Sequence, residues 1–127
     1  MKKGIYLAEI NEERLLLVRK KDIWILPGGK LENEESDYGC LFRELKEELS
    51  VSKQQFRIYN FYKSFIGRTP FSNALLEAKV YFGRLRDGLI KPNNEINDVK
   101  FIRNFKNYKI SEITNKIINS LKKDKYL

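Results

Sequence analysis

The sequence predicts an α+β domain in which a mixed β-sheet is flanked by two helices. Three observations predict it: short strand-like apolar runs near the start, two longer runs with period-two alternation in the middle, and two segments whose apolar residues recur at helical spacing. The chain has 127 residues and a mass of 15.1 kDa, about the length of one domain. We therefore expect a single domain over residues 1–127.

The strands are predicted from apolar runs and from the turn residues between them. In order they are residues 4–10, 14–20, 23–26, 56–66, 74–85 and 97–102. The first two strands are separated only by Asn11, Glu12 and Glu13, so we expect them to form a hairpin. The third strand stops abruptly at Pro27 and the two glycines that follow it, which predicts a turn there.

The helices are predicted from the four-residue spacing of apolar side chains. The first is expected over residues 36–49, behind Ser36 as its N-cap, and the second closes the chain behind Ser111. Their apolar stripes are Leu41, Leu45 and Leu49 in the first helix and Ile113, Ile117 and Leu121 in the second.

The composition is that of an ordinary globular domain, with 42% hydrophobic and 33% charged residues. No apolar run approaches the roughly 20 residues that cross a bilayer. Glu9 interrupts the first apolar stretch before it reaches the roughly 7–15 residues of a secretory leader, so we expect a cytoplasmic protein without a membrane partner. Cys40 is the single cysteine and histidine is absent, which excludes an internal disulfide, Cys/His zinc sites and Ser-His-Asp triads.

Charge is divided unevenly along the chain, whose net charge is +8. Residues 1–51 carry 9 Lys and Arg against 11 Asp and Glu, a net of −2, whereas residues 52–127 carry 16 against 6, a net of +10. Clustered basic residues attract polyanions, so the basic part would suit a nucleotide or, as a partner that the chemistry does not require, RNA. The alternative is a set of surface lysines that meet only solvent.

Acidic side chains crowd one face of the first predicted helix. Glu47 and Glu48 follow Glu44 by three and four residues, and such like-charge pairs each cost a helix about 0.2–0.5 kcal/mol. Arg43 can relieve part of this repulsion, and the remaining carboxylates favour a divalent cation of the kind that hard oxygen ligands select. The alternative is an acidic face that meets only solvent. The Gly-Gly turn before the helix makes this alternative weaker, because glycines can bring bare backbone close to a ligand.

The residues around this helix match a known motif. The Nudix box consists of Gly, five residues, Glu, seven residues, Arg-Glu-aliphatic, one residue, Glu-Glu, one residue and Gly-aliphatic. Residues 29–51 of this sequence supply Gly29, Glu35, Arg43-Glu44-Leu45, Glu47-Glu48 and Ser50-Val51. The chain therefore resembles a Nudix hydrolase, and Leu26-Pro27-Gly28-Gly29-Lys30 is similar to the MutT-like branch. The resemblance implies an α/β/α sandwich, with the box helix and the C-terminal helix flanking a mixed sheet.

The resemblance also implies a reaction, the hydrolysis of a nucleoside diphosphate linked to another group by water that attacks phosphorus. Mg²⁺ is the implied cofactor, with Mn²⁺ as a substitute. Phosphoryl chemistry needs positioning and charge neutralisation rather than a covalent nucleophile, so a chain without histidine can perform it. The implied roles are metal ligands at Glu47 and Glu48, a metal ligand or water-orienting base at Glu44, a carbonyl ligand at Gly29, and support of the motif by Glu35 and Arg43.

Further candidates lie outside the box. Glu95 occupies a place comparable to that of a metal ligand or general base in MutT-like enzymes. The alternative is that Glu95 is an ordinary polar loop residue, and Asp98 is the second choice for the same role. Lys20 resembles a position that meets substrate phosphate, and its alternative is a solvated lysine at a strand end. An aromatic ring could stack on a base, but the sequence does not select one among Trp24, Tyr59, Phe61, Tyr62, Phe65, Phe71, Tyr81 and Phe82.

One position departs from the motif. Ser50 stands where the box has glycine after its helix. If the chain keeps the left-handed geometry of that position, serine costs about 1 kcal/mol of stability. Because the cost falls on stability and not on a ligand, we do not expect the departure to abolish activity.

Three classes of function remain open at the level of sequence. The first is Mg²⁺-dependent hydrolysis of a nucleoside triphosphate to the monophosphate and pyrophosphate, with 8-oxo-dGTP sanitation as one form of it. Within enzymes, the alternatives are a nucleotide sugar, a dinucleoside polyphosphate or an RNA 5′ end. The other classes are a catalytically inactive Nudix-fold regulator that binds nucleotide or RNA, and a basic nucleic-acid binder.

Overall fold

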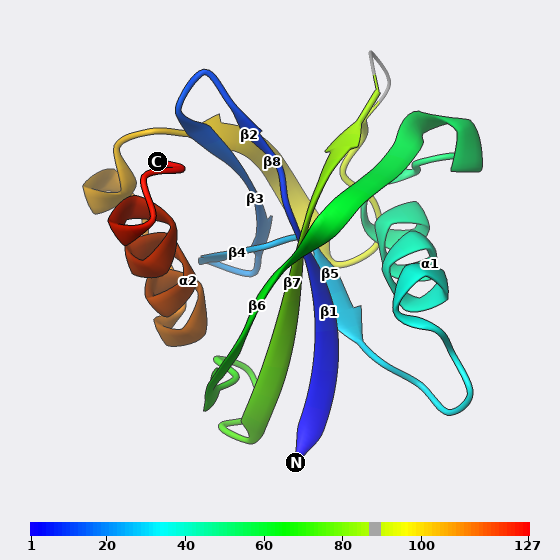
Figure 1. Cartoon of the computed structure of the whole chain (residues 1–127). Coiled ribbons are helices and arrows are strands. Elements are labelled where there is room, and N and C mark those ends of the chain that lie inside the picture. The colour runs from blue at the N-terminus through cyan, green and yellow to red at the C-terminus, as the bar shows by residue number, and fades with distance from the viewer. Residues whose placement is uncertain (87–89) are drawn as a thin grey trace.

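The structure is a computed structural model that describes residues 1–86 and 90–127. Two long helices lie on opposite sides of the strands (Figure 1), which confirms the predicted α+β class with a mixed sheet and two flanking helices. In chain order, the elements are β1 (Lys2–Ala8), β2 (Ile10–Asn11), β3 (Arg14–Lys20), β4 (Ile23–Ile25), β5 (Gly28–Lys30), α1 (Asp37–Leu49), the 3-10 turn Lys53–Gln55, β6 (Phe56–Arg68), β7 (Leu75–Leu85), β8 (Ile96–Ile102), the 3-10 turn Phe105–Asn107 and α2 (Glu112–Lys123).

The described strands form two sheets. Sheet A has the order β5-β1-β7-β6 and is mixed, since β1 runs parallel to β7 while the other neighbours are antiparallel. Sheet B is built around β3, which pairs antiparallel with β2, β4 and β8. The mixed sheet of the prediction is therefore sheet A, and a second, antiparallel sheet lies beside it.

The predicted hairpin between the first two strands is only partly correct. Residues Ile10 and Asn11 of β2 do pair with β3, but β1 belongs to sheet A and β3 to sheet B. The chain leaves sheet A at Glu9, which is buried and accepts a hydrogen bond from the Leu85 N–H at 2.9 Å. Burial raises the pKa of this carboxyl. The point at which the chain passes from sheet A to sheet B is therefore fixed by a contact with Leu85, which lies 76 residues later in the sequence.

The Gly-Gly segment also differs from the prediction. Instead of forming a turn, Gly28 and Gly29 begin the short strand β5, which pairs antiparallel with β1. Gly28 has φ 138° and lies opposite Tyr6, a conformation that favours glycine. This pairing joins the start of the box to the first strand of sheet A.

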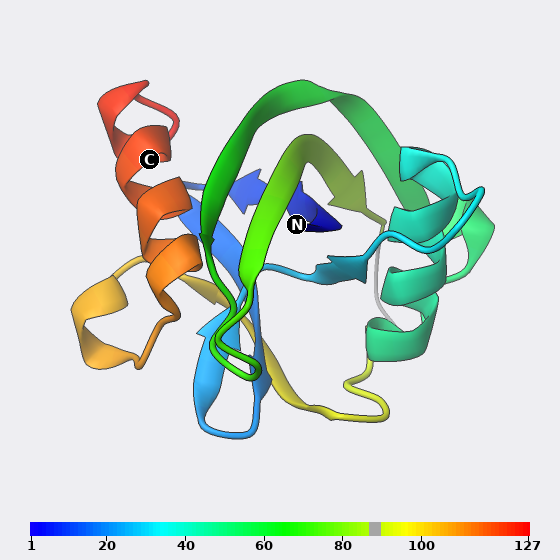
Figure 2. The same ribbon diagram turned by 90° about the horizontal axis from the view of Figure 1, so that it is seen from below.

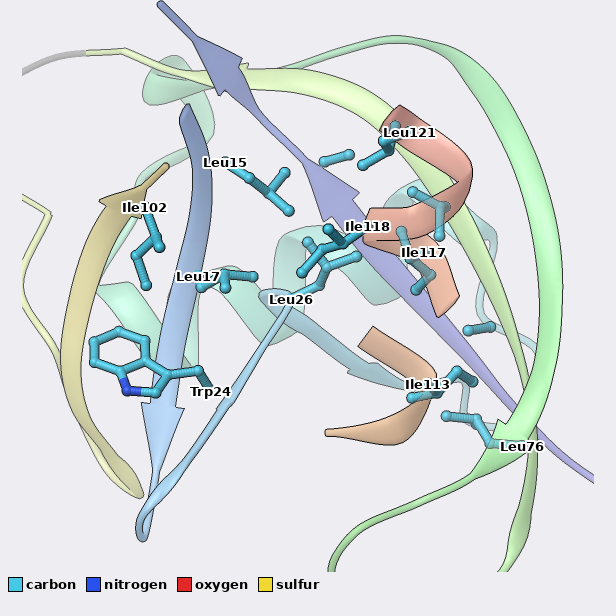
Figure 3. Close-up of a cluster of buried hydrophobic side chains, with 13 residues drawn as sticks. Leu15, Leu17, Trp24, Leu26, Leu76, Ile102, Ile113, Ile117, Ile118 and Leu121 are labelled. Atoms are coloured by element: carbon cyan, nitrogen blue, oxygen red, sulfur yellow. The ribbon is translucent and has the colours of Figure 1, made fainter. Parts of the chain in front are cut away.

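The core consists of two apolar clusters, one under each helix. Strand β3 contributes to both, because Leu15 and Leu17 belong to the cluster of α2 whereas Leu16 and Val18 belong to that of α1. Figure 3 shows the α2 cluster, with Leu17 and Leu26 facing side chains of the helix. A strand covered on both faces is expected to be apolar without alternation, which explains the continuous run of residues 15–18.

Both helices begin as predicted. Ser36 caps α1 by accepting a hydrogen bond from the Gly39 N–H, and Ser111 caps α2 by accepting one from the Thr114 N–H. Helix α1 ends at Leu49, and its C-cap Ser50 has φ 58° and ψ 31°, which lie in the left-handed region. Among the described residues, no helix is both long and apolar enough to span a membrane.

Candidate active site

A cavity of about 560 Å³ opens between α1, the sheets and the start of α2, within the size range of small-molecule sites. The predicted site residues that line it are Glu44, Glu47, Glu48, Glu95 and Lys20. Those that do not appear among its described lining residues are Gly29, Glu35, Arg43 and Asp98. The structure thus brings together residues from β3, α1 and the loop before β8.

Helix α1 presents three of these acids to the cavity. Leu41, Leu45 and Leu49 are fully buried on a neighbouring face of the helix, and this anchoring orients the face that carries the glutamates. Glu47 is half exposed, with 52% of its side chain accessible, whereas Glu44 is only 17% exposed.

Of the three glutamates, Glu48 has a side chain whose pKa is raised strongly by burial. Its Oε1 accepts a hydrogen bond from the Gly28 N–H at 3.0 Å. Burial, with the neighbouring Glu44 carboxylate, raises the pKa of Glu48 to about 8. Burial likewise raises the pKa of Glu44. The two carboxyls therefore retain protons at a higher pH than free glutamate, because burial penalises their charged forms and each lies near another acid.

Arg43 joins the loop before α1 to the helix. Its guanidinium donates to both oxygens of Glu35, at 2.6 and 3.0 Å, and to Oε1 of Glu44 at 2.8 Å. It also donates to the Lys30 carbonyl at 3.0 Å, at the end of β5. The hydrogen bonds from Arg43 hold the pKa of Glu35 at about 2. Arg43 thus connects the loop, the end of β5 and the helix, and the role in motif support that the resemblance implies for Glu35 and Arg43 stays a prediction.

Gly29 lets the backbone pass close to the Glu44 side chain. A Cβ at this position would lie 2.5 and 2.7 Å from the two carboxylate oxygens of Glu44, well inside ordinary contact. The Gly29 carbonyl accepts from the Cys40 thiol at 3.6 Å. Gly29 therefore lies directly against the Glu44 side chain. That the Gly29 carbonyl binds the metal ion stays a prediction.

The loop before β8 reaches the cavity because it caps the last turn of α1. The Lys91 N–H donates to the Leu49 carbonyl at 3.2 Å, and the Asn93 N–H donates to the Glu48 carbonyl at 2.9 Å. The Asn94 amide adds a bond to the Glu47 carbonyl at 2.8 Å. These are carbonyls that a helix end leaves without internal partners. As a result, the loop holds Glu95 beside the acidic face.

Lys20 and Glu95 form an ion pair across the cavity, with the Lys20 Nζ 2.8 Å from Glu95 Oε2. The hydrogen bond from Lys20 lowers the pKa of Glu95. The same ammonium lies 4.8 Å from the ring centroid of Phe71, in the β6–β7 turn. Lys20 thus bridges two loops that border the cavity.

Asp98, the fallback for Glu95, lies elsewhere. It is in β8, opposite Arg19 of β3, and its Oδ1 accepts from the Val99 N–H at 2.8 Å. It is absent from the described lining of the cavity. Of the two candidates, Glu95 is the one that the fold places beside the acids of α1.

The acids fit a hard divalent cation by their donor chemistry. All are carboxylates, and they line one cavity. Among the described residues, no three acidic side chains converge into a ready-made metal cage. Mg²⁺ does not require one, since it typically uses one or two carboxylates, retained waters and substrate phosphate oxygens. The arrangement therefore fits a Mg²⁺ ion that binds together with a phosphorylated ligand.

Among the polar residues of the described lining that sequence reasoning missed are Tyr6, Lys30 and Asn94, which lie with the acids and Lys20. Burial, with Glu48 and Glu44 nearby, raises the pKa of the Tyr6 phenol, so it stays protonated. Its place follows from the pairing of β1 with β5, which no local pattern predicts. Lys30 follows directly after the two glycines of the motif, and this proximity is a signal that could have identified it.

Comparison with known proteins bears on this site. The NUDIX domain model matches residues 3–116. An RNA pyrophosphohydrolase of Ruthia magnifica subsp. Calyptogena magnifica is 39% identical over 56 residues, which cover 43% of this chain and 31% of that protein. The chain thus matches less than a third of the length of this curated relative.

Solved structures share the fold. A UDP-X diphosphatase superimposes with a TM-score of 0.74 at 24% identity, over 89% of this chain and 56% of the other. A MutT protein from Methanosarcina mazei Go1 superimposes with a TM-score of 0.80 at 17% identity, over 97% and 94% of the two chains. Since the family model spans nearly the whole chain and includes the acidic helix, this chain belongs to the NUDIX domain family.

Proposed function

We propose that this protein hydrolyses a nucleoside triphosphate to the monophosphate and pyrophosphate in a Mg²⁺-dependent reaction. The observation that carries the proposal is the cavity, whose lining combines the acids of α1, Glu95 and Lys20 with apolar side chains of β4, β7 and α2. The acids, through a metal ion, and Lys20 suit a triphosphate, whereas the apolar side chains suit a base.

Each residue then has a task. Glu47, Glu48 and Glu44 would hold the metal ion, which when bound neutralises phosphate charge and acidifies water. Glu95 or Glu44 accepts the proton of the attacking water as the bond from phosphorus to the pyrophosphate oxygen breaks. Lys20 binds a phosphate oxygen, for which it must leave its ion pair with Glu95.

The test is a substrate panel with product identification. Purified protein is incubated with nucleoside triphosphates, a nucleotide sugar and a dinucleoside polyphosphate, with Mg²⁺ or with a chelator. Release of pyrophosphate is distinguished from release of phosphate by adding inorganic pyrophosphatase to half of each sample. We expect pyrophosphate from the triphosphates, and only with Mg²⁺. Absence of metal-dependent turnover on every diphosphate would instead favour an inactive binding module.

Two variants of α1 sharpen the test. Glu47→Gln and Glu48→Gln remove one charge each with little change of shape, and we expect each to lower kcat/KM at least about 100-fold. The matched control is Glu112→Gln, which neutralises an exposed acid at the start of α2 outside the cavity. Unchanged turnover in both α1 variants would refute the assignment.

A second candidate is hydrolysis at a triphosphorylated RNA 5′ end. It is favoured by the net charge of +10 over residues 52–127 and by the similarity over 56 residues to an RNA pyrophosphohydrolase. RNA binding would weaken steeply with salt, because neutralised phosphates release counterions. Turnover of triphosphorylated RNA without turnover of free nucleotides would put this candidate first.

A further inference from the structure

The cavity has a second wall that the acidic residues do not form. It consists of apolar side chains from three directions: β4 and the residue after it, β7, and the first turns of α2. The members are Ile25, Leu26, Leu76, Ala78, Ile113 and Ile117. The turn between β6 and β7 closes this wall, with Pro70 and Phe71 in the lining. Figure 2 shows this turn beside the start of α2 and the β3–β4 turn.

The polar groups of this wall are already hydrogen-bonded within the chain. Ser111 donates to the Thr114 hydroxyl at 2.7 Å, and both residues are buried. The hydroxyl of Thr69 lies 2.6 Å from that of Ser72 in its own turn. Among the described residues of this wall, none carries an amide or a charged group. The wall therefore offers shape and apolar surface, but few groups that could read the edge of a base.

Phe71 is the aromatic ring best placed to meet a bound base. Of the eight aromatic residues considered from the sequence, it is the one found in the described lining. Its side chain is 38% exposed, whereas Trp24 is buried and Tyr59 and Phe61 are exposed away from the cavity. The other lining aromatic, Tyr6, lies with the acids opposite Gly28.

The turn that carries Phe71 is ordered by its own hydrogen bonds. The Thr69 N–H donates to the Ala74 carbonyl at 2.9 Å, and the Asn73 N–H donates back to the Thr69 carbonyl at 3.1 Å. These bonds order the backbone from which the ring projects, so the turn itself loses little freedom when a ligand binds. The ammonium groups of Lys20 and Lys21 lie 4.8 and 5.8 Å from the ring centroid. When Lys20 turns to a substrate phosphate, the ring face that it covers becomes available.

We propose that Phe71 stacks on the base of the bound nucleotide and that the apolar wall accepts different bases with similar efficiency. The inference rests on the proposed function and specifies its substrate class as nucleotides of several bases. Stacking tolerates any base, because each has an aromatic face. An enzyme selects strongly between similar ligands when the wrong ligand leaves a buried hydrogen-bonding group unpaired. In an apolar pocket, one methylene more or less changes kcat/KM by only about 10- to 200-fold. An 8-oxo-purine would therefore gain no large advantage.

The first experiment compares kcat/KM for ATP, GTP, CTP, UTP and 8-oxo-GTP under the same conditions. We expect all five values to lie within about 200-fold of one another. A preference above about 1,000-fold for one base would overturn the inference, since it would require a group that reads the base edge. In that case hydrolysis of the favoured triphosphate would still support the proposed function, so the two failures are distinguishable.

The second experiment measures binding without turnover, so that an inactive protein would still test the inference. Affinities for AMP and for ribose 5-phosphate are measured by NMR titration with wild type and Phe71→Ala. We expect the variant to lose about 5- to 150-fold in affinity for AMP, the contribution of one stacked base, and to bind ribose 5-phosphate as wild type does. Upfield shifts of the Phe71 ring protons on addition of AMP are a direct sign of stacking.

The matched control is Phe101→Ala. Phe101 lies in β8, is 36% exposed and does not line the cavity, so its loss is expected to leave both affinities unchanged. Phe71→Trp keeps an aromatic face and should retain AMP binding. Equal losses for AMP and ribose 5-phosphate in Phe71→Ala would show that the residue shapes the turn and does not stack, which would overturn the inference.

Discussion

Gly28 and Gly29, two adjacent glycines at the start of the box, are expected to respond differently to the same substitution, one through stability and the other through activity. In Gly29→Ala, the added Cβ would lie 2.5 and 2.7 Å from the carboxylate oxygens of Glu44, where ordinary contact begins near 3.4 Å. The carboxylate must therefore move by about 1 Å, a displacement that can cost about 100-fold in rate when it affects a positioned group. We expect kcat/KM to fall by about this factor.

Stability should change little in Gly29→Ala. The atoms that must move are the far end of a flexible side chain, and the Arg43–Glu44 ion pair that they weaken contributes at most about 1 kcal/mol. The lower chain entropy of alanine in the unfolded state returns about 0.4–1 kcal/mol. The melting temperature is therefore expected to stay within about 4 °C of the wild type.

Gly28→Ala is the matched comparison. Its φ of 138° is unfavourable for alanine, and its Cβ would meet the backbone of Ile5 and Tyr6 in the paired strand β1. Since backbone cannot swing away, we expect a loss of more than about 2 kcal/mol of stability. Urea unfolding and pyrophosphate release are measured for both variants. A fully active Gly29→Ala protein, or a Gly28→Ala protein as stable as wild type, would refute this reasoning.

Three further predictions concern the ends and supports of α1. Ser50→Gly should raise the melting temperature by about 2–5 °C without loss of activity, because Ser50 adopts φ 58°; thermal unfolding checks this, and a clear fall would contradict the left-handed geometry. Arg43 holds the pKa of Glu35 at about 2, below its ordinary 4.5, so the pair stabilises the fold above pH 4.5 and is lost as the pH falls towards 2. Denaturant unfolding between pH 5 and 2 should show a steeper loss for wild type than for Glu35→Gln. Asn94→Ala removes the bond to the Glu47 carbonyl and should cost about 0.5–1.5 kcal/mol of stability and lower kcat/KM; wild-type kinetics would show that the backbone bonds alone hold the loop.

The local elements could be predicted because each follows from the spacing of neighbouring residues. The leucine stripe and the Ser36 cap define α1 without reference to any other segment. The division into two sheets could not be predicted in this way. It depends on β1 pairing with β7, more than sixty residues away in the sequence, and on a buried contact between Glu9 and the Leu85 N–H. Period-two alternation predicts which residues form a strand, but it does not predict which other strand pairs with that strand.

The same distinction applies to the site. Glu44, Glu47 and Glu48 lie on one helix, so their spacing alone places them on one side of it. Glu95 required the resemblance to a family, since its position depends on how a loop caps the end of α1. The apolar wall and Phe71 come from α2 and the β6–β7 turn, and no pattern within either segment indicates that the two meet.

The glutamates of α1 differ in whether a basic side chain of this chain pairs with them. This difference separates the residues that stabilise the motif from the residue that is explained by a bound ligand. Arg43 reaches Glu35 and Glu44 within hydrogen-bond distance and Glu47 at 3.8 Å. Among the described residues, Glu48 has no ion pair, and its polar contact is the Gly28 N–H. A helix selected only for stability would not keep a carboxyl whose pKa is raised to about 8 by burial beside another acid. The position is explained if the missing positive charge is that of a divalent cation bound together with the substrate, and Glu48→Gln should then retain or gain stability while it loses turnover.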